Sequence, residues 1–149
     1  MEYCFTANAL SKHYKNFKAL NNLSMHVPKG AIYGFVGKNG AGKTTLIRLV
    51  CGLQFPTSGE FNTDRRIYKN RRRIGAVVET PSVYLDATAK ENIKAQYRVL
   101  GMPSFDGVEN LLQLVGLENT GNKRVRDFSL GMRQRLGIAR ALYHNPEIL

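Results

Sequence analysis

The sequence has no uninterrupted apolar run of about 18 residues, the length that crosses a bilayer as a helix, so it contains no membrane span. The first 20 residues lack the basic-then-apolar order of a secretory signal. Cysteine is scarce, and Cys4 and Cys51 are not at a metal-type spacing. We expect both to be reduced, mostly buried thiols of a cytosolic protein. Internal repeats and low-complexity tracts are also lacking, which leaves one globular domain of ordinary size.

Acidic residues are few: 11 Asp and Glu stand against 22 Lys and Arg, giving a net charge of +11. Much of the excess lies in the segment DRRIYKNRRR, residues 64–73. Such a run usually forms a solvated face, although it could also contact nucleic acid or the anionic inner leaflet of a membrane. No aromatic-rich RNA motif lies beside it, and we do not expect nucleic acid as a partner.

The apolar pattern predicts alternating strands and helices, and the hydrophobic fraction of 43% is typical of a globular protein. The segment FPTSGE, residues 55–60, is interpreted as a loop. Thr88 and Glu91 have the spacing of a capping box at a helix start. Strands are expected at 3–10, 23–27, 31–37 and 74–79, and helices at 43–53, 88–100, 108–115 and after Ser129.

The segment GKNGAGKT, residues 37–44, matches the phosphate-binding pattern G-x-x-x-x-G-K-[ST] between an apolar strand and an amphipathic helix. Its glycines allow backbone angles and close approaches that a Cβ would block, so that N–H groups converge on an anion. Lys43 is expected to reach the β- and γ-phosphates of a nucleotide, and the Thr44 hydroxyl to ligate Mg²⁺. The predicted phosphate-binding residues are Gly37, Lys38, Asn39, Gly40, Ala41, Gly42, Lys43, Thr44 and Thr45.

A second motif, FSLGMRQRLGIARAL at residues 128–142, resembles the signature motif L-S-G-G-Q-[RKQ]-Q-R of ABC (ATP-binding cassette) ATPases. Ser129 is a good helix N-cap, and free N–H groups around Gly131 would make a second anion site. The alternative is an ordinary capped helix with Leu136, Ile138, Ala139 and Leu142 facing a core. The resemblance implies that Ser129, Leu130, Gly131 and Met132 contact the γ-phosphate held by an opposite subunit, so that two chains enclose two ATP molecules.

Two further positions follow from the resemblance. Tyr14 stands where the family has an aromatic residue that stacks on adenine, although a lone Tyr is more often a packing residue. Glu79 stands where the family has a glutamine that senses Mg²⁺ and the transport partner, and is a candidate metal ligand and, with Lys43, a candidate catalytic residue. Glu79, and SLGM in place of S-G-G-Q, resemble the bacitracin-resistance and lantibiotic-immunity branch of exporters.

The resemblance implies an α/β P-loop fold with an amino-terminal antiparallel β subdomain and a mainly helical insertion. Residues 1–80 would hold the β subdomain and P-loop core, 81–122 the insertion, and 123–149 the signature motif and its helix. The implied protein is the ATPase subunit of a membrane exporter of an antimicrobial peptide or drug, cytoplasmic and peripheral on the inner face of the membrane. Its partners would be a second ATP-binding subunit and a separate membrane-spanning permease. The alternative is a soluble ABC-type ATPase acting on ribosomes or nucleic acid.

The final residues NPEIL, 145–149, resemble the lead-in to the Walker B strand of ABC ATPases. In that family the strand ends in an Asp that holds Mg²⁺, followed by a Glu that polarises the attacking water and, later, a histidine that contacts the γ-phosphate. None of His13, His26 or His144 maps onto that histidine. We therefore expect an amino-terminal portion of a longer cassette, truncated before Walker B, with little ATPase activity of its own.

Overall fold

The computed structural model describes residues 2–63, 73–78, 81–99, 101–102 and 104–149. The chain divides into two compact units. The first comprises Met1–Ile74 together with Ile148, and the second comprises Gly75–Glu147 together with Leu149. No helix in the described part of the chain is long and apolar enough to cross a membrane.

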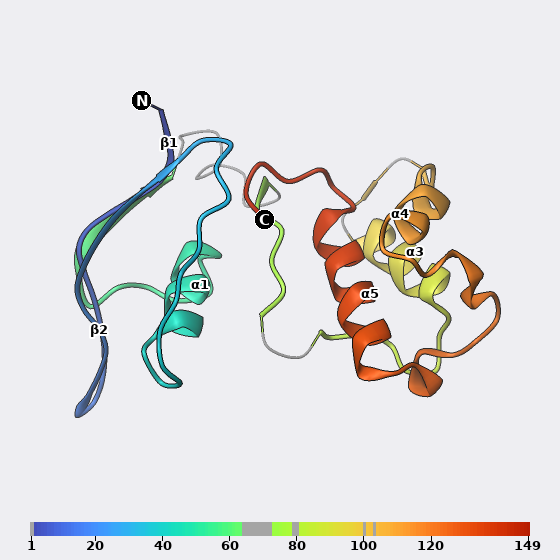
Figure 1. Cartoon of the computed structure of the whole chain (residues 1–149), viewed down its shortest axis with the longest axis horizontal. Helices are drawn as coiled ribbons and strands as arrows, with labels where there is room; N and C mark the ends of the chain where they lie inside the picture. The colour runs from blue at the N-terminus through green and yellow to red at the C-terminus, as the bar shows by residue number, and fades with distance from the viewer. Residues whose placement is uncertain (1, 64–72, 79–80, 100, 103) are drawn as a thin grey trace. The chain divides into compact units, whose positions relative to one another are not determined.

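The first unit is built on a three-stranded antiparallel sheet in the order β2-β1-β3 (Figure 1). β1 spans Tyr3–Tyr14, β2 spans Phe17–Pro28 and β3 spans Ser58–Thr63. β1 and β2 are the expected strands, but each is longer than its alternating apolar pattern indicated, because the hairpin ladder continues through polar residues to Tyr14 and Phe17.

β3 corrects the sequence-based prediction of a loop over residues 55–60. Gly59, which favoured the loop interpretation, adopts a left-handed φ of +74° inside the strand. A Cβ on Gly59 would lie 2.2 Å from the carbonyl oxygen of Ala9 on β1. The glycine therefore permits a close approach between the paired strands β1 and β3. A glycine that allows such an approach cannot be told from a turn glycine by composition alone.

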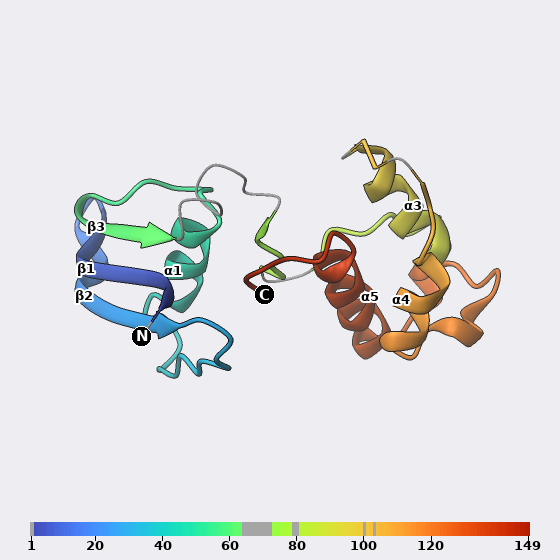
Figure 2. The ribbon, with the colours of Figure 1, turned by 90° about the horizontal axis from the view of Figure 1, so that it is seen from above.

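One helix, α1 (Lys43–Val50), covers one face of this sheet (Figure 2). It ends earlier than the expected residue 53, because Gly52 turns the chain with a φ of +66° and Leu53 N–H donates to the Arg48 carbonyl at 2.8 Å. The helix and the sheet share one core. Its buried members are Phe5, Ala7, Leu10, Leu20, Leu46 and Leu49.

The strands expected at 31–37 and 74–79 do not form in the described residues, apart from one parallel bridge between Ile74 and Ile148. The side chains of Ile32 and Val36 are fully or almost fully exposed, at 104% and 95%. An apolar run of this kind becomes a strand when neighbouring strands take its N–H and C=O groups and cover its faces. Within the described part of the chain, residues 31–37 have no such neighbour.

The second unit is helical, with α3 (Ala89–Val99), α4 (Val108–Leu114) and α5 (Leu130–Leu142). Two short 3-10 turns, Glu118–Thr120 and Val125–Asp127, lie between α4 and α5. The three expected helices are thus confirmed, each within a residue or two of its expected limits. Their shared core contains Ala89, Ile93, Tyr97, Val108, Leu112, Leu117, Val125, Phe128, Leu136 and Ala139.

The predicted capping box at the start of α3 is confirmed. Thr88 N–H donates to the Glu91 carboxylate at 2.7 Å, and Glu91 N–H donates to the Thr88 hydroxyl at 3.2 Å. The Thr88 N–H, together with the Thr88 hydroxyl that donates to the same carboxylate at 3.0 Å, holds the pKa of the Glu91 carboxyl below its ordinary value. One turn further, the buried Asn92 amide donates to the carbonyls of Tyr84 and Thr88 at 2.9 Å each and accepts from Tyr84 N–H at 2.7 Å. Residues 84–88 are therefore fixed to the first turn of α3.

Candidate functional site

The glycine-rich turn before α1 has the backbone that anion binding requires. Gly40 and Gly42 adopt left-handed φ angles of +82° and +84°, as expected. A Cβ on Gly42 would lie 2.1 Å from the carbonyl oxygen of Ala19 on β2, so the turn is pressed against the sheet. Gly37 differs, because its φ is not left-handed and a Cβ there would lie 3.1 Å from the Ala41 Cβ. The absence of a side chain at Gly37 therefore leaves space for the Ala41 methyl group.

Lys43 is the first residue of α1, and its side chain folds back into the turn. The ammonium donates to the carbonyls of Gly37 at 2.6 Å and Lys38 at 2.7 Å. The N–H groups of the first helical turn have no partners within the helix, and the helix dipole makes this end positive. A positive charge and the N–H groups of a helix start therefore lie in one short segment, the chemistry that binds a phosphate chain.

The remaining predicted residues of the turn lie next to Lys43 in the chain. The side chains of Lys38 and Asn39 are exposed, whereas Thr44 and Thr45 are half-buried in the first turn of α1. The Thr44 hydroxyl is a hard oxygen donor directly after Lys43, which suits a Mg²⁺ ion shared with phosphate oxygens. Thr44 is therefore the candidate Mg²⁺ ligand in the described part of the chain, where no group of three or more His, Cys, Asp or Glu side chains could hold a metal ion.

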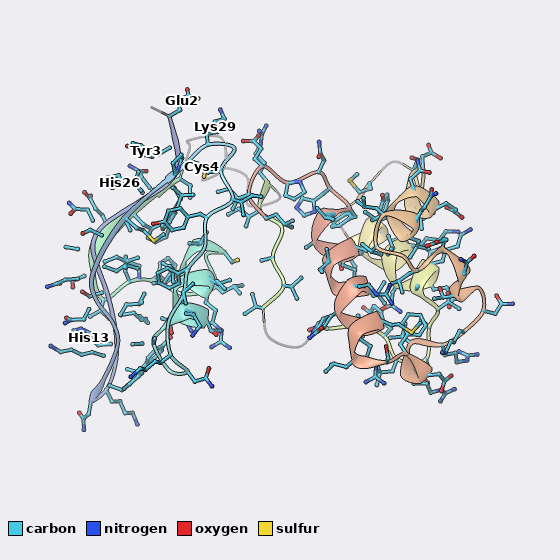
Figure 3. All side chains as sticks on the ribbon, viewed as in Figure 1. Glu2, Tyr3, Cys4, His13, His26 and Lys29 are labelled. Atoms are coloured by element: carbon cyan, nitrogen blue, oxygen red, sulfur yellow. The ribbon has the colours of Figure 1, made fainter. Side chains whose placement is uncertain are left out.

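Tyr14 lies at the hairpin end of β1, next to the labelled His13 in Figure 3. Its ring is 39% exposed, and its hydroxyl donates to the Gln54 side-chain oxygen. The Lys12 ammonium lies over the ring, 5.4 Å from its centroid. Tyr14 is thus not a core residue. The opposite end of the sheet carries Glu2, Tyr3, Cys4, His26 and Lys29, with a Glu2–Lys29 ion pair at 3.3 Å (Figure 3).

Ser129 caps α5 as the sequence predicts. Its hydroxyl accepts a hydrogen bond from Met132 N–H at 3.2 Å. Leu130 is 68% exposed, and a Cβ on Gly131 would meet only the Ser129 hydroxyl, at 4.0 Å. The first turn of the signature segment is therefore open, with Met132 half-buried below it.

Two arginines of the same motif have structural partners that the sequence did not reveal. Arg135 donates to the Gly116 carbonyl at 3.1 Å and the Val115 carbonyl at 3.4 Å, which caps the end of α4. Arg133 donates to the Arg126 carbonyl at 2.8 Å. Of the residues that would line a core, Leu136 and Ala139 are buried, but Ile138 is 42% exposed, so its assignment to the core is wrong.

A connection between residues 85–88 and 124–126 was not predicted. Val125 N–H donates to the Ala87 carbonyl and Arg126 N–H to the Leu85 carbonyl, both at 2.9 Å. The Arg126 guanidinium also pairs with the Asp86 carboxylate at 3.0 Å. These bonds attach the segment before α3 to the turn that leads into Ser129. Nothing in the local sequence marks them, because they join backbone groups far apart in the chain.

A cavity of about 250 Å³ in the helical unit is lined by residues 76–78, 81 and 82 and by residues of α3 and α5. Arg140 reaches it from α5, donating to the Gln96 side-chain oxygen at 2.6 Å, and burial lowers the Arg140 pKa. A Cβ on Gly137 would lie 2.6 Å from the Pro81 ring, so the segment after residue 80 lies directly on α5. Glu79, the candidate metal ligand and catalytic residue, lies outside the described residues.

Comparison with known proteins decides the family. The model of a family described as "ABC transporter" matches residues 20–149. The chain belongs to the ABC transporter family. The resemblance to ABC ATPases, drawn from residues 37–44 and 128–142, is thereby confirmed, as is the α/β class with its amino-terminal antiparallel sheet.

The curated relatives include proteins named for bacitracin and for lantibiotic transport, the branch that Glu79 and SLGM indicated. The bacitracin transport ATP-binding protein BcrA of Bacillus licheniformis is 46% identical over 145 residues, covering 94% of this chain and 47% of BcrA. The lantibiotic transport ATP-binding protein SrtF of Streptococcus pyogenes is 41% identical over 142 residues, covering 94% of this chain and 62% of SrtF. The chain thus spans about half the length of the curated relatives it matches.

Solved structures agree with this assignment. CbiO1 from Clostridium perfringens, part of the ABC transporter complex CbiONQ, superposes with a TM-score of 0.79 at 26% identity over 98% of this chain and 63% of that one. A dimeric post-hydrolysis structure of the ATP-binding cassette MJ0796, bound to ADP and Pi, superposes with a TM-score of 0.80 at 26% identity, covering 95% and 70% of the two chains.

We predict that Gly42→Ala abolishes measurable MgATP binding, because the new methyl group would collide with the Ala19 carbonyl at a left-handed backbone angle and displace the turn. Gly30→Ala is the matched control, since Gly30 has a similar φ of +75° with no atom within 4 Å of the added Cβ. Titration calorimetry of both variants is the measurement. Equal ATP affinity in the two variants would contradict the role given to the Gly42–Ala19 contact.

Proposed function

We propose that this chain is the ATP-binding part of an ABC-type exporter, in which ATP binding and hydrolysis drive transport through a separate permease. The observation that carries the proposal is the Lys43 ammonium held between the Gly37 and Lys38 carbonyls at the start of α1. Phosphate oxygens are stronger acceptors for this cation than neutral carbonyls. ATP would therefore replace the two carbonyl contacts with β- and γ-phosphate contacts, while the N–H groups of 39–45 bind the same phosphates.

The other nucleotide contacts follow from their positions. The exposed ring of Tyr14 would stack on adenine, and the half-buried hydroxyl of Thr44 would ligate Mg²⁺ bound to the phosphates. Mg²⁺ supplies charge neutralisation at the phosphates. Glu79 is proposed as a further metal or water ligand, on its resemblance alone. Lys43 would stabilise the negative charge that develops on the transferred phosphoryl group.

The signature turn would serve the nucleotide of a second ATP-binding subunit. Its support is the open start of α5, where Ser129 and Gly131 present N–H groups and a hydroxyl without a covering side chain. A helix of 13 residues offers a positive end to a γ-phosphate. The dimeric arrangement of the cassette bound to ADP and Pi supports the same assignment for this chain.

The helical unit would transmit nucleotide state to the permease at the inner face of the membrane. The bonds between 85–88 and 124–126 support this role, because a displacement of the segment before α3 would move the turn that carries Ser129. The relatives named for bacitracin and lantibiotic transport favour an antimicrobial peptide or drug as the transported molecule.

Lys43→Ala should reduce MgATP affinity by about tenfold or more while leaving the unfolding transition unchanged, because it removes charge-assisted contacts of about 1.5–3 kcal/mol. Lys18→Ala is the control, since Lys18 is an exposed lysine of β2 that lies outside the glycine-rich turn. Calorimetric titration with MgATP measures both. Unchanged affinity in a folded Lys43→Ala variant would overturn the proposed nucleotide site.

Ser129→Arg should leave ATP binding by each subunit intact yet prevent ATP-dependent dimerisation, because the long side chain would fill the site of the partner's γ-phosphate. Gln113→Arg adds the same charge at an exposed position of α4 and should dimerise normally. Sedimentation with and without ATP separates the two outcomes. A Ser129→Arg variant that dimerises with ATP as the control does would exclude the role across the interface.

A further inference from the structure

We propose that Lys12 and Gln54 are positioning residues for Tyr14, holding its ring so that one face is covered by an ammonium group and the other is offered to a purine base. The inference rests on the proposed function, since it adds two residues to the adenine end of the same site. It concerns the first unit only, where all three residues lie on β1 or in the loop that follows α1.

The Tyr14 ring is fixed at two points. Its hydroxyl donates to the Gln54 side-chain oxygen, which restrains the ring at its tip. The Lys12 ammonium lies 5.4 Å from the ring centroid, which places a cation against one face. Lys12 and Tyr14 are two residues apart on one strand, so their side chains leave the same side of the sheet.

The two restraining residues are themselves held. The Lys12 ammonium donates to the Phe55 carbonyl at 2.7 Å, so it cannot leave the ring without losing a charge-assisted hydrogen bond. Thr57 N–H donates to the Ser11 carbonyl at 2.9 Å, and its hydroxyl accepts from His13 N–H at 3.0 Å. The loop that contains Gln54 is thus attached to β1 on both sides of Lys12.

This arrangement affects base binding in two ways. Tyr14 lies at a hairpin end and is 39% exposed, so without these restraints its side chain would lose conformational entropy when a base binds. A cation on one face also draws electron density from the ring, which favours stacking of an electron-rich purine on the other face. Both effects act on the base and neither acts on the phosphates. Loss of either restraint should therefore weaken the binding of ATP and leave the binding of a phosphate chain without a base unchanged.

The test compares MgATP with magnesium tripolyphosphate, which has the phosphate chain and no base. Lys12→Met keeps the length of the side chain and removes the charge, and Lys18→Met removes a charge from an exposed residue of the same hairpin as the matched control. We expect Lys12→Met to weaken MgATP binding by about two- to fivefold, the strength of an exposed cation–π contact, and to leave tripolyphosphate binding unchanged. Lys18→Met should change neither.

Gln54→Leu and Tyr14→Phe test the second restraint. Each removes one partner of the same hydrogen bond, so the double variant should bind MgATP no more weakly than either single variant. Tyr14→Ala should weaken MgATP binding by roughly tenfold to a hundredfold, the range for loss of a base-stacking side chain, again without affecting tripolyphosphate.

Failure of the positioning roles and failure of the proposed nucleotide site give different results. If Tyr14→Ala weakens MgATP binding while Lys12→Met and Gln54→Leu do not, the positioning roles are wrong and the nucleotide site stands. If Tyr14→Ala has no effect on MgATP, the adenine contact itself is wrong. If Lys12→Met or Gln54→Leu weakens both ligands equally, these residues maintain the loop and do not position the ring, which also overturns the inference.

Discussion

The carbonyl oxygen of Ala19 lies 2.1 Å from the position that a Cβ on Gly42 would take, and the proposed nucleotide site depends on this close approach of two backbones. Only glycine lets the turn approach β2 so closely at a left-handed angle. The approach places the start of α1 against the sheet, and Leu46 and Leu49 then bury themselves in the shared core. Because the helix start is fixed in this way, the Lys43 ammonium and the first N–H groups of α1 lie in one short segment beside the sheet.

A second helix start proposed as an anion site lies in the second unit, and its residues differ from those at the start of α1. α5 has Ser129 as a hydroxyl cap and Gly131 as an open position, and it has no lysine in its first turn. Its stability comes from elsewhere in the motif, since Arg135 caps α4 and Leu136 is fully buried. The residues of this motif therefore have two kinds of role. Ser129 and Gly131 form the exposed helix start, whereas Arg135 and Leu136 hold α5 against the rest of the helical unit.

Patterns that depend on local geometry could be predicted from the sequence. The glycine-rich turn, the Thr88–Glu91 capping box and the Ser129 cap are set by neighbouring residues, and each was found where expected. Features that depend on distant partners could not. Gly59 favours a turn until β1 is known to lie beside it, and residues 31–37 have the composition of a strand but no neighbour in the described part of the chain. The Lys12–Tyr14–Gln54 arrangement likewise joins two residues of β1 to Gln54, which lies 40 or more positions further along the chain.

The central claim is that the N–H groups of residues 39–45 and the Lys43 ammonium bind the phosphate chain. Hydrogen exchange of these backbone amides, resolved by residue, tests it most directly. The account predicts that magnesium tripolyphosphate slows exchange at residues 39–45 as strongly as MgATP does, whereas adenosine leaves these amides unchanged. Protection of these amides by adenosine, or none by tripolyphosphate at concentrations that saturate binding, would contradict the account.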